Sequence, residues 1–271
     1  MEIERYNIIK KYIPLSKDTI VLGIGEGYRQ IIESNEVLKF YNCDYFSNEE
    51  ILEERGISLE SKLNNKEVMN IDFVCKDNNY LKAINKENYF DLIISNHCFE
   101  HLDNFIDMFK QVNKLLKNNG YLFITLPDKK YSFDHFRKNT EISHLIYDYV
   151  YNDKNQHKQH LIESEIFYDN INPPNECPNW FAKNRLMNKK FDKKYDIEDN
   201  RFIENIHPGI HRHVFESESF ASQIIEPMLY LYFDNFELIS CNKIKETGEF
   251  YTILQKRVNA NIKFPEDLFS N

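Results

Sequence analysis

Short apolar runs alternate with amphipathic segments through the first half of the chain. Predominantly apolar runs occupy residues 19–22, 37–43, 71–75, 90–95 and 121–126. Runs of this length are typical of strands buried on both faces of a parallel sheet. Between the last two runs, residues 102–117 carry apolar side chains three and four positions apart, which predicts an amphipathic helix. Strands that alternate with helices in this way predict a doubly wound α/β sheet.

Three shorter signals complete the expected core. Residues 3–12 and about 28–34 have helical spacing. The sequence Asn118-Asn119-Gly120 predicts the end of the helix over residues 102–117, because Asn and Gly accept the left-handed conformation found at helix C-termini.

The pattern loosens after residue 126 and becomes regular again near residue 217. The intervening polar, aromatic and histidine-bearing stretch is too long for a structureless loop, so we expect an inserted cap after the fifth strand. Residues 217–230 then predict a helix, and residues 236–240 and 250–254 predict an antiparallel hairpin at the sheet edge. The expected divisions are a core of residues 1–126, a cap of 127–214, and a segment of 215–271 that completes a mostly parallel, seven-stranded, Rossmann-like sheet.

Composition and charge exclude several classes of protein. A net charge of −9 and a pI near 5.5 argue against a nucleic-acid partner, because neutralising phosphates requires a basic face. No window approaches 18 uncharged apolar residues, and the start MEIERYNIIKKYIP interleaves its charges with apolar residues. We therefore expect no membrane span and a cytoplasmic protein. The five cysteines are widely spaced without a CxxC pair, which favours reduced thiols. The sequence indicates no particular oligomeric state.

The segment VLGIGEG places Gly25 and Gly27 where the first strand turns into a helix. Glycine suits this turn because the backbone must bend tightly and let a ligand approach without a Cβ. Asp44 ends the next strand, 17 positions after Gly27, near the spacing at which an acidic side chain binds ribose hydroxyls. The sequence therefore predicts a nucleotide site. A nicotinamide-dependent dehydrogenase remains a minor alternative, because the turn lacks the third glycine of that fingerprint.

Five segments in order carry a resemblance to class I S-adenosylmethionine-dependent methyltransferases. They are VLGIGEG, NCDYF, VCKDNNYL, FDLIISNHCFEHLDN and LLKNNGYLFITLPD, over residues 15–126, and the terminal hairpin matches as well. The resemblance implies S-adenosylmethionine as methyl donor, with Asp44 on its ribose. It implies a donor site formed by Gly25, Glu26, Gly27, Asp44, Tyr45, Asp77, Asn78 and Asn96.

The same resemblance has two departures in the glycine turn. The family usually carries an acidic residue where this chain has Gly23, and often a further glycine where it has Arg29. We expect Glu26 to supply the missing charge to the amino group of the methionine part.

Methyl transfer to a hydroxyl or an amine requires a group that removes a proton, and histidine is the natural base near neutral pH. His97 and His101 follow the fourth strand, at the carboxyl edge where ligands bind in open α/β sheets. His213 lies at the end of the expected cap. We predict the catalytic base among these three histidines. Each could instead be a helix cap or a structural histidine.

The cap contains a second set of polar candidates. Asp128, Arg137, His211 and Arg212 are expected to contact the substrate. Guanidinium binds phosphate bidentately, so Arg137 and Arg212 could hold a phosphorylated substrate, although Arg137 could equally pair with Asp134. His211 and His213 would share one face of an extended segment, which leaves a divalent metal possible but unproven.

The cap and the segment HRHVFESESF resemble methyltransferases associated with bacterial surface-polysaccharide (capsule) biosynthesis. This resemblance implies a sugar hydroxyl as acceptor, on a nucleotide-activated or phosphorylated precursor. The prediction is an S-adenosylmethionine-dependent O-methyltransferase that acts on a carbohydrate. Two alternatives stay open, a small-molecule N- or carboxyl methyltransferase and a non-catalytic S-adenosylmethionine-binding interaction protein.

Overall fold

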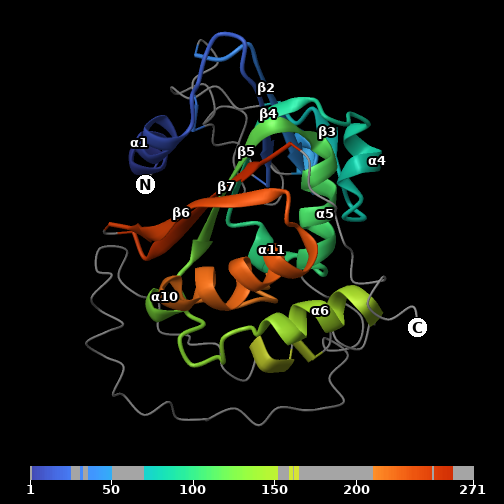
Figure 1. Cartoon of the computed structure of the whole chain (residues 1–271). Coiled ribbons are helices and arrows are strands. Elements are labelled where there is room, and N and C mark those ends of the chain that lie inside the picture. The colour runs from blue at the N-terminus through green and yellow to red at the C-terminus, as the bar shows by residue number, and fades with distance from the viewer. Residues whose placement is uncertain are drawn as a thin grey trace.

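The chain forms one seven-stranded sheet with helices packed on it (Figure 1). The computed structural model describes residues 2–25, 31–32, 36–50, 70–151, 159–160, 162–164, 210–245 and 247–258. The strands are β1 (Ile20–Ile24), β2 (Lys39–Asp44), β3 (Phe73–Val74), β4 (Phe90–Asn96), β5 (Leu116–Pro127), β6 (Phe236–Ile244) and β7 (Glu249–Lys256). Their order is β3-β2-β1-β4-β5-β7-β6.

The sheet is parallel except at one end. β1 to β5 run parallel, and β7 pairs antiparallel with both β5 and β6. This confirms the doubly wound, mostly parallel fold with a terminal hairpin. The third strand, Phe73–Val74, is shorter than expected.

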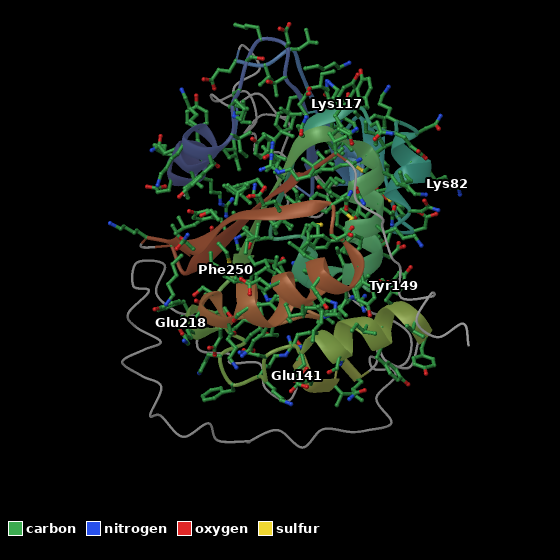
Figure 2. All side chains as sticks on the ribbon, viewed as in Figure 1. Lys82, Lys117, Glu141, Tyr149, Glu218 and Phe250 are labelled. Carbon is green, nitrogen blue, oxygen red and sulfur yellow. The ribbon has the colours of Figure 1, made fainter. Side chains whose placement is uncertain are left out.

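Neighbouring residues of each strand bury their side chains in separate cores on the two faces of the sheet. On β1, Val21 joins a core with Ile9 of the first helix, whereas Leu22 joins a core with Phe109. This alternation follows from the two-residue period of a strand. Phe250 of β7 is fully buried within the molecule, whereas Lys82 lies at its periphery, as Figure 2 shows.

The helices are α1 (Glu2–Tyr12), α4 (Tyr80–Ile84), α5 (Phe105–Leu115), α6 (Ile142–Tyr151), α10 (Ser217–Phe220) and α11 (Glu226–Tyr232). Single helical turns lie at η1 (Phe99–His101), η2 (Lys129–Tyr131) and η3 (Ala221–Ile225). The helix expected near residues 28–34 lies outside the described residues. None of the described helices combines the length and apolar character that crossing a bilayer requires.

Two helices differ from expectation for identifiable reasons. The helix expected to run to residue 117 ends at Leu115, and Asn119 adopts the predicted left-handed conformation (φ 65°) within the turn into the body of β5. The helix expected over residues 217–230 is present but contains a π-turn at η3. Pro227 lies in the first turn of α11 and has no N–H to donate to the preceding turn, which accounts for the wider register there.

Asp128 joins the end of β5 to the start of α10. Its side chain is 1% exposed, and Oδ2 accepts hydrogen bonds from the hydroxyl (2.6 Å) and the N–H (3.4 Å) of Ser217. Oδ1 accepts the N–H of Lys130 (3.0 Å), which caps η2. Asp128 therefore fixes the point at which the chain leaves the sheet.

We predict that Asp128→Ala lowers the free energy of unfolding by about 1–3 kcal/mol, because buried donors lose their acceptor. Urea denaturation followed by circular dichroism measures this change. Lys138→Ala is the control, since it breaks only an exposed ion pair with Glu141, which contributes little to stability. Equal effects of the two substitutions would contradict the role of Asp128.

Candidate active site

Bare backbone lies at the carboxyl end of β1. Gly25 has φ 71°, and its N–H donates to the carbonyl oxygen of Cys43 (2.9 Å) at the end of β2. A Cβ at Gly25 would lie 2.7 Å from the Cβ of Cys98, closer than side chains tolerate. Both the conformation and the close approach therefore require glycine here. Glu26 and Gly27 lie outside the described residues.

A buried carboxylate ends the neighbouring strand. Asp44 is 8% exposed, and its Oδ1 accepts the N–H of Phe46 (3.1 Å). Because Ile24 pairs with Cys43, Asp44 and Gly25 are the next residues along adjacent strands. Tyr45 is exposed, and its ring contacts that of Phe46 edge-on. A glycine backbone beside a buried carboxylate fits an adenosyl group, whose ribose hydroxyls donate to such an oxygen.

The other expected donor-site residues follow β3 and β4. Asn96 is buried at the end of β4, and its Oδ1 accepts the hydroxyl of Thr125 (2.7 Å). Asp77 and Asn78 follow β3 and line a groove of about 540 Å³ that runs along α4 and α5. Asn78 has φ 56° and donates to Asp103 (3.4 Å). The structure thus brings Gly25, Asp44 and Asn96 to one edge of the sheet, with Asp77 and Asn78 on its flank.

His97 lies between two carboxylates directly after β4. Its Nδ1 is 3.2 Å from Oε1 of Glu100, and its Nε2 is 2.9 Å from Oε1 of Glu249 on β7. Arg5 of α1 holds Glu249 in turn (2.8 Å). Burial lowers the pKa of His97, but the hydrogen bonds and charges of the two carboxylates outweigh it and raise the pKa to about 9. His97 is therefore an imidazolium at neutral pH, and an imidazolium accepts no further proton.

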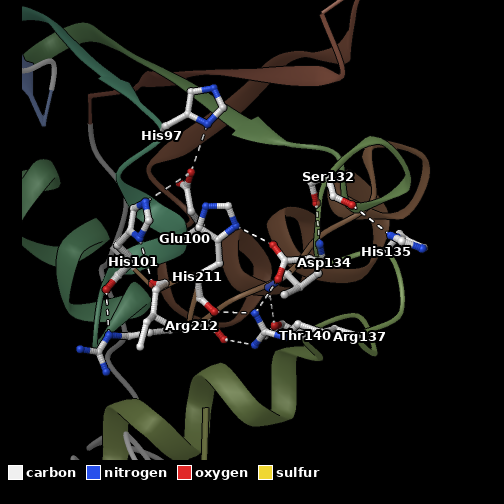
Figure 3. Close-up of polar contacts among 12 residues, drawn as sticks. His97, Glu100, His101, Ser132, Asp134, His135, Arg137, Thr140, His211 and Arg212 are labelled. Atoms are coloured by element: carbon white, nitrogen blue, oxygen red, sulfur yellow. Dashed lines mark hydrogen bonds and ion pairs between the residues drawn. The ribbon is translucent and has the colours of Figure 1, made fainter. Parts of the chain in front are cut away.

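Glu100 is a fully buried carboxylate at the centre of the site (Figure 3). Burial raises its pKa, but the hydrogen bond and the charge of His97 bring the pKa down to about 2. Nδ1 of His97 lies 3.2 Å from Oε1 of Glu100, so the two groups form an ion pair. Glu100 thus carries a negative charge that the imidazolium of His97 balances.

Two further imidazoles converge on Glu100 with fixed orientations. Nδ1 of His101 lies 2.9 Å from the carbonyl oxygen of Ile210, which only accepts, so Nδ1 carries the proton and Nε2 keeps its lone pair. Burial lowers the pKa of His101. Nδ1 of His211 faces Oδ2 of Asp134 at 2.6 Å, so Nδ1 is the nitrogen that donates to this carboxylate. The ligand atoms of Glu100, His101 and His211 lie within 4.8 Å of one another.

Arg137 and Arg212 both bind protein groups. Arg137 is 1% exposed and donates to Asp134 (2.9 Å), to Glu163 (3.1 Å) and to the carbonyl oxygen of His211 (2.5 Å). The ion pair with Asp134 that the sequence left open is therefore present. Arg212 pairs with Asp103 (2.7 Å) and donates to the carbonyl oxygen of His101 (2.9 Å). Both guanidinium groups hold the backbone around the histidines.

His211 and His213 belong to different clusters. His213 is 1% exposed, and burial holds its pKa well below the usual range. It gathers with His144, Asp148 and His160, and the sequence analysis missed Asp148 and His160. The spacing of His144 and Asp148, four positions apart on one helix, was a usable signal. Glu249 and His160 gave no such local signal.

Comparison with known proteins gives a family. A family model described as a methyltransferase domain matches residues 22–224. Among solved structures, the chain is similar to an S-adenosylmethionine-dependent methyltransferase from Aquifex aeolicus, with 12% identity over 93% of this chain and 89% of that chain and a TM-score of 0.43. One from Mesorhizobium loti shows 9% identity over 93% and 98% of the two chains, with a TM-score of 0.48.

A third similar structure is phosphoethanolamine N-methyltransferase 1 of Haemonchus contortus in complex with phosphoethanolamine and S-adenosylhomocysteine. It shows 14% identity over 98% of this chain but only 45% of that chain, with a TM-score of 0.50. At such identities this likeness supports the fold alone. No curated protein matches the sequence.

We predict that Asp44→Ala weakens binding of S-adenosylhomocysteine by about 5- to 150-fold, equivalent to about 1–3 kcal/mol, because ribose hydroxyls lose a buried acceptor. Isothermal titration calorimetry measures the affinity. Asp91→Ala is the matched control: Asp91 accepts the N–H of Ile20 at the opposite edge of the sheet, so binding should persist. Unchanged affinity in Asp44→Ala would refute the assignment of Asp44 to the donor site.

The charge of His97 makes a pH-dependent contribution to stability. Because its folded pKa is raised from 6.5 to about 9, the stabilisation is complete below about pH 6.5 and is lost as the pH rises through 9. We predict that His97→Gln lowers the free energy of unfolding most at pH 6 and least at about pH 9.5. Denaturant titrations at several pH values measure the difference. If the difference in free energy of unfolding between the wild type and His97→Gln stays constant with pH, His97 is not held as an imidazolium by the two carboxylates.

Proposed function

The chain belongs to the methyltransferase domain family, whose model covers residues 22–224, and we propose that it methylates a hydroxyl group of a carbohydrate. As a member of this family it is an S-adenosylmethionine-dependent methyltransferase. The donor, when bound, supplies an electrophilic methyl carbon on a sulfonium. The residues proposed to hold it are Gly25, Glu26, Gly27, Asp44, Tyr45, Asp77, Asn78 and Asn96.

The pairing of His211 with Asp134 is the observation that carries the proposal. A hydroxyl is a poor nucleophile until a base removes its proton, whereas an amine already has a free lone pair when neutral. Asp134 fixes the ring of His211 through Nδ1 (2.6 Å), so Nε2 is oriented to accept a proton. Burial raises the pKa of Asp134, but His211 and Arg137 hold it below its usual value, so the carboxylate stays charged. We assign the base role to His211.

Two neighbouring groups support this base. His101 also presents a neutral Nε2, and its ring centroid lies 4.8 Å from that of His211. Its lowered pKa suits it to accept a hydrogen bond or to act as the base in place of His211. Glu100 lies against both rings and would stabilise the imidazolium that forms when either takes the proton. His97 keeps the charge of Glu100 balanced throughout and does not exchange its own proton at neutral pH.

Arg137 and Arg212 act as positioning residues in this mechanism. Arg137 holds the carboxylate of Asp134 and the backbone of His211 at once. Arg212 ties the same segment to Asp103 and to the backbone of His101. Asp128, joined to Ser217, sets where the proposed cap of residues 127–214 begins. A substrate phosphate would have to displace these contacts, so we favour an acceptor held through its hydroxyl groups.

The carbohydrate assignment is supported by the resemblance of the cap to methyltransferases of surface-polysaccharide biosynthesis. We propose that the acceptor is a cytoplasmic sugar precursor. A screen of soluble sugar nucleotides for a donor-dependent gain of one methyl group tests this, with fragmentation to locate the methylated atom. A methyl group found on nitrogen or on a carboxylate, or donor binding without turnover on any extract, would contradict the proposal.

We predict that His211→Gln and Asp134→Asn each lower kcat by about 10²- to 10⁴-fold, the usual contribution of general-base catalysis. Affinity for S-adenosylhomocysteine should stay unchanged. His135→Gln is the matched control, because Nδ1 of His135 lies 3.2 Å from the carbonyl oxygen of Ser132 and its ring packs against Phe136, outside the cluster around Glu100. Full activity in His211→Gln would show that another residue is the catalytic base.

A further inference from the structure

A second cluster of imidazoles lies behind the proposed base. His144 and Asp148 extend from α6, His160 from the segment at residues 159–164, and His213 from the segment that also carries His211. Nε2 of His144 lies 3.0 Å from Nε2 of His160 and 3.3 Å from Oδ2 of Asp148. Nε2 of His160 lies 3.5 Å from the same oxygen. The ligand atoms of all four residues lie within 4.8 Å of one another.

Two buried members of this cluster carry polar atoms without a hydrogen-bond partner among the described residues. His213 is 1% exposed, and neither of its ring nitrogens makes a hydrogen bond of good geometry to any described residue, although the backbone of Leu102 lies near. Oδ2 of Asp148, a residue 4% exposed, is likewise unsatisfied among the described residues. Leaving such groups buried and unpaired costs about 1–3 kcal/mol each. A single cation bound between the ring nitrogens and the carboxylate oxygen would satisfy all of these atoms at once.

We propose that His144, Asp148, His160 and His213 bind a single Zn²⁺ ion. Tetrahedral zinc with ligands at about 2.0–2.2 Å has neighbouring ligand atoms about 3.3–3.5 Å apart. The three measured separations, 3.0, 3.3 and 3.5 Å, match one face of that tetrahedron. His213 supplies the fourth ligand after a small inward movement of its ring. Imidazole and carboxylate are also ligand types that zinc accepts.

The number of ligands indicates the kind of zinc site. Four protein ligands would fill the coordination sphere, which is typical of structural rather than catalytic zinc. The ion would therefore tie α6 and His160 to the segment that presents His211, and this role does not rest on the proposed carbohydrate acceptor.

The neighbouring group of Glu100, His101 and His211 is the weaker candidate. Both Nδ1 atoms there already donate, to Ile210 and to Asp134. The carboxylate of Glu100 already has the imidazolium of His97 as its counter-charge, 3.2 Å away. In the second cluster, Asp148 lies within the electrostatic influence of Arg212, but that guanidinium makes its ion pair with Asp103.

Metal analysis of the purified chain tests the proposal. We expect about one zinc per chain after expression with added Zn²⁺ and exhaustive dialysis, and about 10-fold less in Asp148→Asn and His160→Gln. His135→Gln and His211→Gln should keep the ion. Zinc content below about 0.1 per chain in the folded wild type would overturn the proposal. So would loss of zinc from His211→Gln with retention in His160→Gln, because the ion would then belong to the other group.

Two further measurements cover variants that fail to fold. His144→Gln alters the most exposed of the four ligands, with 33% side-chain exposure, and should fold while losing most of the zinc. In the wild type, chelation should lower Tm, and re-addition of Zn²⁺ should restore it, because the ion binds only the folded state. Replacement by Co²⁺ should give the intense visible absorption of a tetrahedral site. A Tm unaffected by chelation, or a weak octahedral Co²⁺ spectrum, would contradict the closed four-ligand site.

Discussion

The charge of Glu100 is the constraint on which the site depends. A fully buried carboxylate stays ionised only when nearby groups compensate for the loss of water. His97 provides the main compensation, and it does so from a left-handed backbone conformation (φ 50°) that is unusual for a residue with a Cβ. Such strain persists where the surrounding structure fixes it, and it is concentrated at functional sites. The turn after β4 is therefore shaped by the need to hold this pair together.

The same residue joins the core to the cap through its backbone. The carbonyl oxygen of Glu100 accepts the N–H groups of Arg212 (2.7 Å) and His213 (3.0 Å). On the other side, His97 reaches Glu249 of β7, which Arg5 of α1 holds. Segments from the beginning, the middle and the end of the chain are thus linked through Glu249, His97 and Glu100. A change at any of them would alter the orientation of His211, even where no substrate is touched.

The sequence predicted the sheet because its signals are local. Val21 and Leu22 lie in a continuous apolar run, and the glycine turn and Asp44 follow directly from the ends of two strands. It also placed His97 and His101 at the correct edge. It did not predict that two carboxylates would hold His97 protonated, because Glu249 comes from the last strand and its approach depends on the whole sheet.

The cap was less predictable for the same reason. Arg137 and Asp134 lie three positions apart, so their ion pair was an open alternative from sequence. The pairing of Asp134 with His211, and the separation of His211 from His213 into different clusters, depend on where the chain returns after the cap. Two residues that alternate along an extended segment share one face only where that segment is straight. The sequence prediction of a shared face for His211 and His213 assumed such a segment. The bends around Arg212, held by Asp103 and His101, turn them apart.

The central claim is that the methyl donor and the imidazoles around Glu100 meet at the carboxyl edge of β4. A crystal structure with bound S-adenosylhomocysteine tests this most directly. The account predicts the adenosyl group between Gly25 and Asp44, with the sulfur directed toward the cluster of His101 and His211. A ligand bound elsewhere, or one whose sulfur points away from that cluster, would contradict it.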